Sequence, residues 1–273
     1  MRFAVGLPNA GEFGHPEILL ELAHEAEEAG WDGAFVWDHI ARREGVWPVV
    51  DPWVALGAVA ARTERLMLGV MVTPLSRRRP WKVARETQTL QLLSEGRFIF
   101  GAGLGSTPEV EFAPFGEETD ARVRAEMLDE GLEILEGLWS GEPFSFEGKH
   151  YRVEGAHFIP PVHVPVWIAG RWPAKRPMRR AARFDGVFPI HQDVPVNENM
   201  TPAQLREIVD YTLAHRDKAG PFAVAMEGLS DPGDDVGDYG EAGLTWWVER
   251  LAWHRGPLSQ TRERLRAGPP SAA

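Results

Sequence analysis

Short runs of apolar residues alternate with longer amphipathic stretches along almost the whole chain. This alternation is typical of parallel strands joined by crossover helices rather than of hairpins. The apolar runs predict eight strands, over residues 3–8, 33–38, 66–73, 97–103, 164–169, 186–190, 222–226 and 244–248. The amphipathic stretches predict helices over residues 16–29, 51–61, 80–94, 119–139, 175–183, 201–216 and 259–266.

One segment departs from this alternation. Between residues 144 and 153, aromatic and polar residues alternate around the sequence Glu147, Gly148, Lys149, which indicates a hairpin with a tight turn. We expect it to form an excursion before the fifth strand. Residues 231–243 are rich in Asp and Gly and carry little helical pattern, although a crossover helix is expected there.

Eight strands with crossover helices favour one α/β fold, a TIM-type (β/α)8 barrel, which typically takes about 250 residues. A doubly wound open sheet commonly needs about five or six strands and fits less well. The predicted helix 119–139 carries the stripe that a helix packed on a barrel requires, with Leu128, Leu132, Leu135 and Trp139 at spacings of three and four. We expect one barrel domain over residues 1–268 and a short C-terminal tail over 269–273.

Composition narrows the range of partners. The chain of 273 residues is 44% hydrophobic and 25% charged, and its net charge of −11 disfavours nucleic acids and anionic membranes as partners. The absence of cysteine excludes disulfides, thiolate metal sites and a cysteine nucleophile. No apolar leader or run of 18 apolar residues is present, so we expect a soluble, cytoplasmic protein.

In TIM barrels the functional residues follow the strands at their C-terminal ends. This rule selects Asn9, His191 and Glu227, and tryptophans in nearby loops, among them Trp47, could wall a substrate pocket. The adjacent pair Asp38 and His39 is the most informative, because a histidine titrates near neutrality and a neighbouring carboxylate can bind a polar ligand edge. The same two residues could equally serve to complete a strand end.

Glycines and arginines supply further candidates. Gly101, Gly103 and Gly105 lack the third glycine of a dinucleotide fingerprint, but they would let a planar ring or a phosphate approach the backbone. Arg171 follows the fifth strand, where a phosphate could reach a helix N-terminus. The run Arg77–Arg79 could bind an anion, although a solvated loop is the favoured interpretation. The histidines show no metal-ligand spacing, so no metal is predicted.

Several motifs together resemble the luciferase-like flavin oxidoreductases. They are the strand ending Gly33–His39, the segment from Ala84 to Arg97 with the glycines that follow it, and the segment Pro165–Gly170. The resemblance extends to about residue 190. It implies a TIM-type barrel that uses FMN, or in a large branch of the family the deazaflavin coenzyme, to move hydride or to activate dioxygen.

The resemblance also implies roles for individual residues. His39 and Glu109 would be the catalytic residues. The cofactor would be bound by residues at the ends of the second to fifth strands, with a bulge and sometimes a cis peptide in the third; these are Asp38, Met71, Val72, Thr73, Gly103, Gly105, Gly170 and Arg171. It further implies a homodimer and, for FMN chemistry, a separate reductase.

These residues lead to one hypothesis and three alternatives. We expect hydride exchange between the cofactor and a small organic substrate, with His39 transferring a proton and Glu109 assisting. A reduced flavin reacting with dioxygen would instead give a monooxygenase. A barrel hydrolase would use Asp38 and Glu227 as paired carboxylates. A third possibility is a protein that binds the cofactor without catalysis.

Overall fold

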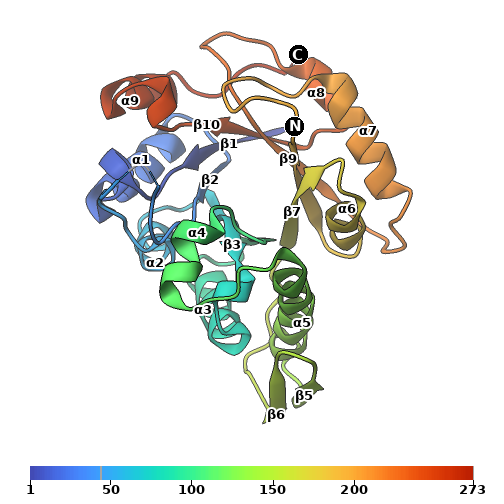
Figure 1. Cartoon of the computed structure of the whole chain (residues 1–273). Helices are drawn as coiled ribbons and strands as arrows, with labels where there is room; N and C mark the ends of the chain where they lie inside the picture. Colours follow the sequence, from blue (N-terminus) through green and yellow to red (C-terminus); the bar gives the residue numbers. More distant parts are fainter. Residues whose placement is uncertain (44, 273) are drawn as a thin grey trace.

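The computed structural model describes residues 1–43 and 45–272, so residues 44 and 273 of the expected barrel and tail lie outside the described residues. Within these residues, eight parallel strands close a barrel in the order β1-β10-β9-β8-β7-β4-β3-β2 (Figure 1). The predicted TIM-type barrel is therefore confirmed. The barrel strands are β1 (Arg2–Leu7), β2 (Gly33–Val36), β3 (Met67–Pro74), β4 (Phe98–Gly103), β7 (Val166–Trp172), β8 (Gly186–His191), β9 (Ala223–Gly228) and β10 (Trp246–Arg250).

Helices surround the barrel and connect its strands. The longer ones lie where the amphipathic pattern predicts them, and the largest differences are at α7, which ends at Leu213 instead of 216, and at β7, which ends at Trp172 instead of 169. The helices are α1 (Pro16–Glu28), α2 (Pro52–Ala60), α3 (Pro80–Leu93), α4 (Pro108–Glu111), α5 (Ala121–Trp139), α6 (Lys175–Ala181), α7 (Pro202–Leu213), α8 (Gly237–Glu241) and α9 (Leu258–Arg266), with 3-10 turns Gly11–Phe13, Leu75–Arg77, Ala113–Phe115 and Trp253–Arg255.

The predicted hairpin is present and projects from the barrel beyond α5 (Figure 1). Strands β5 (Phe144–Glu147) and β6 (Arg152–Ala156) are antiparallel and form a separate two-stranded sheet. At the other end of the chain, the backbone N–H of Ser271 donates to Asp234 O, and Val236 N–H donates to Ser271 O. The last described residues are therefore attached to the loop that precedes α8.

The core has two layers. Inside the barrel, the rings of Phe35, Trp167 and Trp246 contact one another with centroid separations of 5.4–5.9 Å. Each such aromatic pair is worth about 0.5–1.5 kcal/mol beyond the area it buries. Between strands and helices, the α5 stripe of Leu128, Leu132, Leu135 and Trp139 is buried, as its spacing predicts.

Strand β3 is irregular where it approaches the barrel mouth. Its register with β4 shifts between Val70 and Thr73, and the peptide bond between Met71 and Val72 is cis. The bulge that the resemblance implies at residues 71–73 is thus present. A Cβ atom at Gly103 on β4 would lie 2.8 Å from Cγ2 of Val72, so this strand end tolerates only glycine without rearrangement.

Candidate functional site

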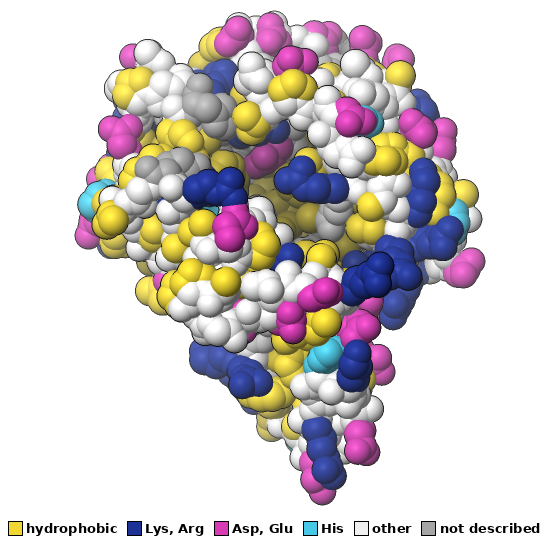
Figure 2. Space-filling view, in the orientation of Figure 1, with side chains coloured by type: hydrophobic (Ala, Val, Ile, Leu, Met, Phe, Trp, Pro, Cys, Tyr) yellow, Lys and Arg dark blue, Asp and Glu magenta, His cyan; other side chains and the backbone are white. Residues whose placement is uncertain are grey.

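A cavity of about 290 Å³ opens at the C-terminal end of the barrel. The face seen in Figure 2 is hollowed at its centre, with hydrophobic side chains in the depth and Lys or Arg side chains along the rim. The size lies near the lower end of the range for small-molecule sites. The cavity is lined mainly from β8, β9, β10 and the loop after β8, by Trp37, Arg171, Phe188, Pro189, Ile190, His191, Val194, Pro195, Val196, Glu198, Met200, Met226, Glu227 and Arg250.

Asp38 anchors a polar cluster beside the cavity. Its fully buried carboxylate accepts two hydrogen bonds from Arg78, at 2.8 Å and 3.1 Å, and a third from Arg77 at 3.2 Å. The indole N–H of Trp53 donates to the same carboxylate at 3.3 Å. A buried carboxylate needs such partners, since an isolated charge in the interior is very costly. Arg77 and Arg78 are therefore structural ion-pair partners, and the expected solvated loop is wrong for both.

His39 faces a second buried carboxylate, that of Glu111. Its Nδ1 lies 2.5 Å from Oε1 of Glu111, whose side chain is 1% exposed, and Arg77 donates to the other oxygen, Oε2, at 2.8 Å. On the opposite edge of the ring, Nε2 lies 2.9 Å from Nη1 of Arg42. A guanidinium can only donate hydrogen bonds, so this contact favours an unprotonated Nε2.

Two neighbouring elements hold this cluster in place. Asn9 is fully buried, and its amide N–H groups donate to the carbonyls of His39 and Val50 at 2.8 Å, while its oxygen accepts from His39 N–H at 3.2 Å. Arg124 on α5 donates to Leu104 O at 2.7 Å, which fixes the loop leading to α4. Burial lowers the pKa of this guanidinium below its ordinary value.

The cavity contains a second ion pair, between Glu227 and Arg250. Arg250 Nε donates to Glu227 Oε2 at 3.2 Å, and the indole N–H of Trp37 donates to Oε1 at 3.1 Å. Gly6 on β1 leaves the space for this carboxylate, because a Cβ there would lie 3.1 Å from Glu227 Oε1. The other polar side chains of the lining are Arg171, His191 and Glu198, and the remaining lining residues are apolar.

The side chains in the opposite half of the barrel mouth, at the ends of β3, β4 and β7, are small and apolar. Val72 and Ala169 pack against the interior cluster, and the missing side chain of Gly103 lies beside both of them. Met71 belongs to that interior cluster and is 5% exposed. Thr73 is the register partner of Ala102, whose side chain packs in the outer layer, so the Thr73 side chain also points away from the barrel interior. The buried Thr73 hydroxyl has no hydrogen-bond partner among the described atoms.

The glycines at the other strand ends are fixed by packing. Gly105 has φ of +76°, and a side chain there would meet the ring of Pro74 at 2.9 Å. Gly170 lies against Pro177 of α6, where a Cβ would come within 2.2 Å. By contrast, Arg171 is exposed at the cavity rim, and its guanidinium has no hydrogen-bond or ion-pair partner within the described part of the chain.

The remaining predicted site residues lie at different distances from the cavity. His191 lines it, whereas Trp47 is connected to it through Trp253, whose ring it contacts at 5.0 Å and which in turn contacts Trp37 at 5.5 Å. The Glu109 side chain is 50% exposed and forms an ion pair with Arg43 on the surface. Its predicted catalytic role stays a prediction.

Sequence reasoning did not select Glu111 or Arg250 as members of the site, and it favoured a solvated loop for Arg77 and Arg78. Glu109 and Glu111 lie about 200° apart around the axis of α4, so they face opposite directions, but no periodic pattern in the sequence predicts this four-residue helix. For the arginines one signal was present: Arg77–Arg79 follow closely after an apolar strand in an acidic chain, and partly buried guanidinium groups need carboxylate partners.

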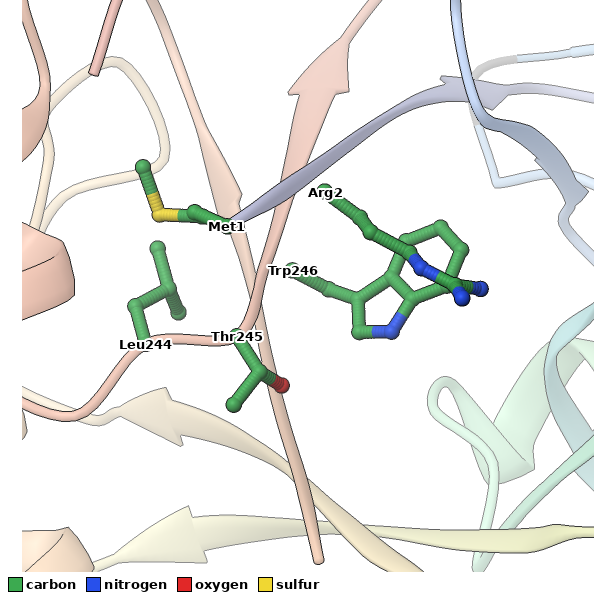
Figure 3. A pocket seen from close by; sticks show the side chains of 5 residues that line it. All are labelled: Met1, Arg2, Leu244, Thr245 and Trp246. Atoms are coloured by element: carbon green, nitrogen blue, oxygen red, sulfur yellow. The ribbon is translucent and has the colours of Figure 1, made fainter. Parts of the chain in front are cut away.

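A second hollow lies at the opposite end of the barrel. It measures about 270 Å³ and is formed where β1 and β10 begin, by Met1, Arg2, Leu244, Thr245 and Trp246 (Figure 3). The Arg2 guanidinium lies 5.3 Å from the Trp246 ring centroid. Enzymes with this fold carry their chemistry at the C-terminal strand ends, so the first cavity is the candidate site.

Within residues 1–43 and 45–272, no group of three or more His, Asp or Glu residues could hold a metal ion. No helix in these residues is both long and apolar enough to span a membrane.

The sequence matches a family model described as luciferase-like monooxygenase over residues 1–217. It is also similar to two curated proteins called F420-dependent glucose-6-phosphate dehydrogenase. That of Nakamurella multipartita is 37% identical over 173 residues, which cover 61% of this chain and 50% of the relative. That of Nocardia farcinica is 37% identical over 172 residues, covering 60% and 50%. The chain thus spans about half the length of the curated relatives it matches.

Solved structures share the fold. A monooxygenase from Streptomyces bottropensis superposes with a TM-score of 0.70 at 25% identity, covering 98% of this chain and 79% of the other. An F420-dependent secondary alcohol dehydrogenase, solved with an F420-acetone adduct, gives a TM-score of 0.70 at 21% identity and covers 88% and 72%. These likenesses support the barrel assignment.

Proposed function

We propose, from the premise that this chain belongs to the luciferase-like monooxygenase family, that it is a flavin-type oxidoreductase acting on a small organic molecule. The deazaflavin coenzyme F420 is the first candidate cofactor, because the curated relatives named above depend on it. The observation that carries the proposal is the arrangement of His39 and its buried ion pairs beside an apolar cavity at the C-terminal end of the barrel.

The residues at the barrel mouth fit such a cofactor. Val72, Gly103 and Ala169 offer small apolar groups against which a planar ring can lie. Arg171 at the rim has a guanidinium free to bind a phosphate, which it can do through two parallel hydrogen bonds. When bound, the cofactor would supply the hydride transfer, a step that protein side chains do not perform.

The chain itself would handle the proton. His39 can accept the hydroxyl proton of an alcohol at Nε2, or return it to a carbonyl oxygen in the reverse direction. A substrate hydroxyl at Nε2 would replace the contact with Arg42. The apolar cavity walls would exclude water from the reacting atoms.

The cavity also suggests a substrate class. Glu227 and Arg250 offer one acceptor and one donor site to a single hydroxyl or carbonyl group, and the surrounding Phe188, Ile190 and Met226 suit an apolar body. We therefore propose an alcohol or ketone with a hydrocarbon skeleton. A sugar phosphate would have to bury several hydroxyls against apolar walls, at about 1–3 kcal/mol for each one left without a partner.

We expect a hydrocarbon alcohol to exceed glucose 6-phosphate in kcat/KM by about a hundredfold or more with the F420-loaded protein, because two unpartnered hydroxyls already cost that much. Initial rates of cofactor reduction with a panel of secondary alcohols and sugar phosphates measure this. A preference for the sugar phosphate would refute the proposed substrate class and leave the cofactor assignment standing.

Cofactor binding tests the proposed function directly. Fluorescence or calorimetric titration with F420, and separately with FMN, is expected to give saturable binding of F420. Arg171→Ala should weaken it about tenfold through loss of a charged hydrogen bond to phosphate. Arg176→Ala, an exposed arginine on α6, is the matched control and should bind as the wild type does. Failure to bind either cofactor would refute the redox function.

Two alternative functions are a hydrolase and an FMN-dependent monooxygenase. A hydrolase would need Asp38 and Glu227 as working carboxylates, but Asp38 is fully buried in ion pairs with Arg77 and Arg78. Selective FMN binding would instead favour the monooxygenase, with a separate reductase as partner. We further propose a cytoplasmic homodimer, in keeping with the cysteine-free composition and with Leu92 and Leu93 exposed on α3.

A further inference from the structure

We infer that Glu111 is the positioning residue of this site: it holds His39 as a neutral ring with the proton on Nδ1 and the lone pair on Nε2. Its consequence for catalysis rests on the proposed function, whereas the tautomer itself is a property of the chain alone. The resemblance that selected Glu109 did not point to Glu111.

The contacts at the two edges of the His39 ring favour the same tautomer. A carboxylate can only accept hydrogen bonds and a guanidinium can only donate them. Glu111 Oε1 lies 2.5 Å from Nδ1 and Arg42 Nη1 lies 2.9 Å from Nε2. The ring must therefore donate through Nδ1 and accept through Nε2. The Trp37 ring packs edge-on against it at 5.8 Å, which limits rotation of the imidazole.

Arg77 fixes Glu111 in turn. Its Nη1 donates to Glu111 Oε2 at 2.8 Å, and its Nη2 donates to the carbonyl and carboxylate oxygens of Asp38 at 2.8 and 3.2 Å. The Arg77 guanidinium thus bridges the carboxylates of Glu111 and Asp38, and Arg78 forms a further ion pair with Asp38. With side-chain exposures of 5% for Arg77 and 1% for Glu111, the pair has little freedom to turn away.

This arrangement prepares His39 to accept a proton. The Nε2 lone pair can take a proton from a substrate hydroxyl, and the positive charge of the resulting imidazolium is shared over the ring, whose Nδ1 edge faces the Glu111 carboxylate. A buried carboxylate that selects a tautomer and then stabilises the imidazolium is the established role of the third member of a catalytic triad. The carboxylates of Asp38 and Glu111 balance the guanidinium groups of Arg77 and Arg78 before this proton arrives. The positive charge of Arg42 would leave the Nε2 edge when a substrate hydroxyl replaces it there.

The tautomer can be measured in the cofactor-free protein. Long-range ¹H–¹⁵N correlation spectra of histidine-labelled protein distinguish the protonated ring nitrogen from the unprotonated one. The His39 signals are identified by their loss in His39→Gln. We expect a pyrrole-type Nδ1 and a pyridine-type Nε2 in the wild type. A proton on Nε2 in the wild type would overturn the inference, and this measurement needs no further variant to fold.

Glu111→Gln gives the second measurement. Arg77 can only donate, so it will take the oxygen of the new side-chain amide, which turns the amide NH₂ toward Nδ1 of His39. The proton should then move to Nε2, which breaks the contact between Nε2 and Arg42. In the F420-dependent reaction, kcat should fall about tenfold to hundredfold with little change in KM. Glu111→Asp, which retains the charge, should keep the wild-type tautomer and recover part of kcat.

Glu154→Gln is the matched control, since Glu154 is 85% exposed on the β6 strand of the hairpin. It should change neither the tautomer nor kcat. An unchanged tautomer together with wild-type kcat in Glu111→Gln would overturn the inference, and a loss confined to Glu109→Gln would return the assisting role to Glu109. Absence of cofactor binding would refute the proposed function while leaving the tautomer result valid, so the two failures are distinguishable.

Discussion

Replacing His39 with alanine is expected to lower kcat about a hundredfold to ten-thousandfold, the range typical for loss of a general acid or base. The affinity for F420 should remain close to that of the wild type. The backbone of His39 keeps its hydrogen bonds to Asn9, and Glu111 keeps its ion pair with Arg77, so the surroundings stay assembled. Steady-state rates with a secondary alcohol and fluorescence titration of F420 measure the two quantities.

The control for this variant is His24→Ala. His24 lies on α1, its side chain is 58% exposed, and its only described ion-pair partner is Glu28, so its loss should leave kcat unchanged. Turnover of His39→Ala at the wild-type rate would remove His39 from proton transfer. A matching loss of cofactor affinity would indicate instead that His39 acts mainly in binding.

The fold was predictable because its pattern is local. Each strand reads as a short apolar run and each long helix as a stripe such as Leu128, Leu132, Leu135 and Trp139, and these periods follow from backbone geometry alone. The short α4 was not predicted. It spans four residues, Pro108 to Glu111, which is too short for a periodic signal.

The candidate site was only partly predictable. The strand-end rule found Asp38 and His39, which lie in the expected place. Their partners Arg77 and Glu111 are 39 and 72 residues away from them in the sequence, so only the folded chain brings them together. The choice between Glu109 and Glu111 depends on how α4 is rotated, and that depends on tertiary contacts around the loop, such as the hydrogen bond from Arg124 to Leu104 O.

Asparagine in place of Asp38 is expected to lower the free energy of unfolding by about 3–5 kcal/mol, the usual loss when a buried ion pair loses one partner. Arg78 would lose both of its hydrogen bonds to a charged oxygen, and Arg77 would keep only Glu111 as an anionic partner. Arg77 would then hold Glu111 less firmly, so kcat should fall as well. Urea unfolding and steady-state rates give the two values.

Glu249→Gln shows what the loss of a buried carboxylate does to stability when that carboxylate lies outside the site. Glu249 is also fully buried, accepts from Ser230 and Trp247, and pairs with Arg255 and Arg264 between β10 and α9. Its replacement should lower the free energy of unfolding by about 3–5 kcal/mol, because Arg255 and Arg264 lose their buried anionic partner. Because its carboxylate does not line the cavity, kcat per folded molecule should stay at the wild-type level.

Comparison of the two variants decides what Asp38 does. If Asp38 contacted the cofactor directly, as the family resemblance implies, Asp38→Asn would weaken F420 binding while its stability changed little. If it holds Arg77 and Arg78, its stability loss should match that of Glu249→Gln, and only Asp38→Asn should also lose turnover. The second outcome is the one we expect, since no atom of the Asp38 side chain is exposed to the cavity.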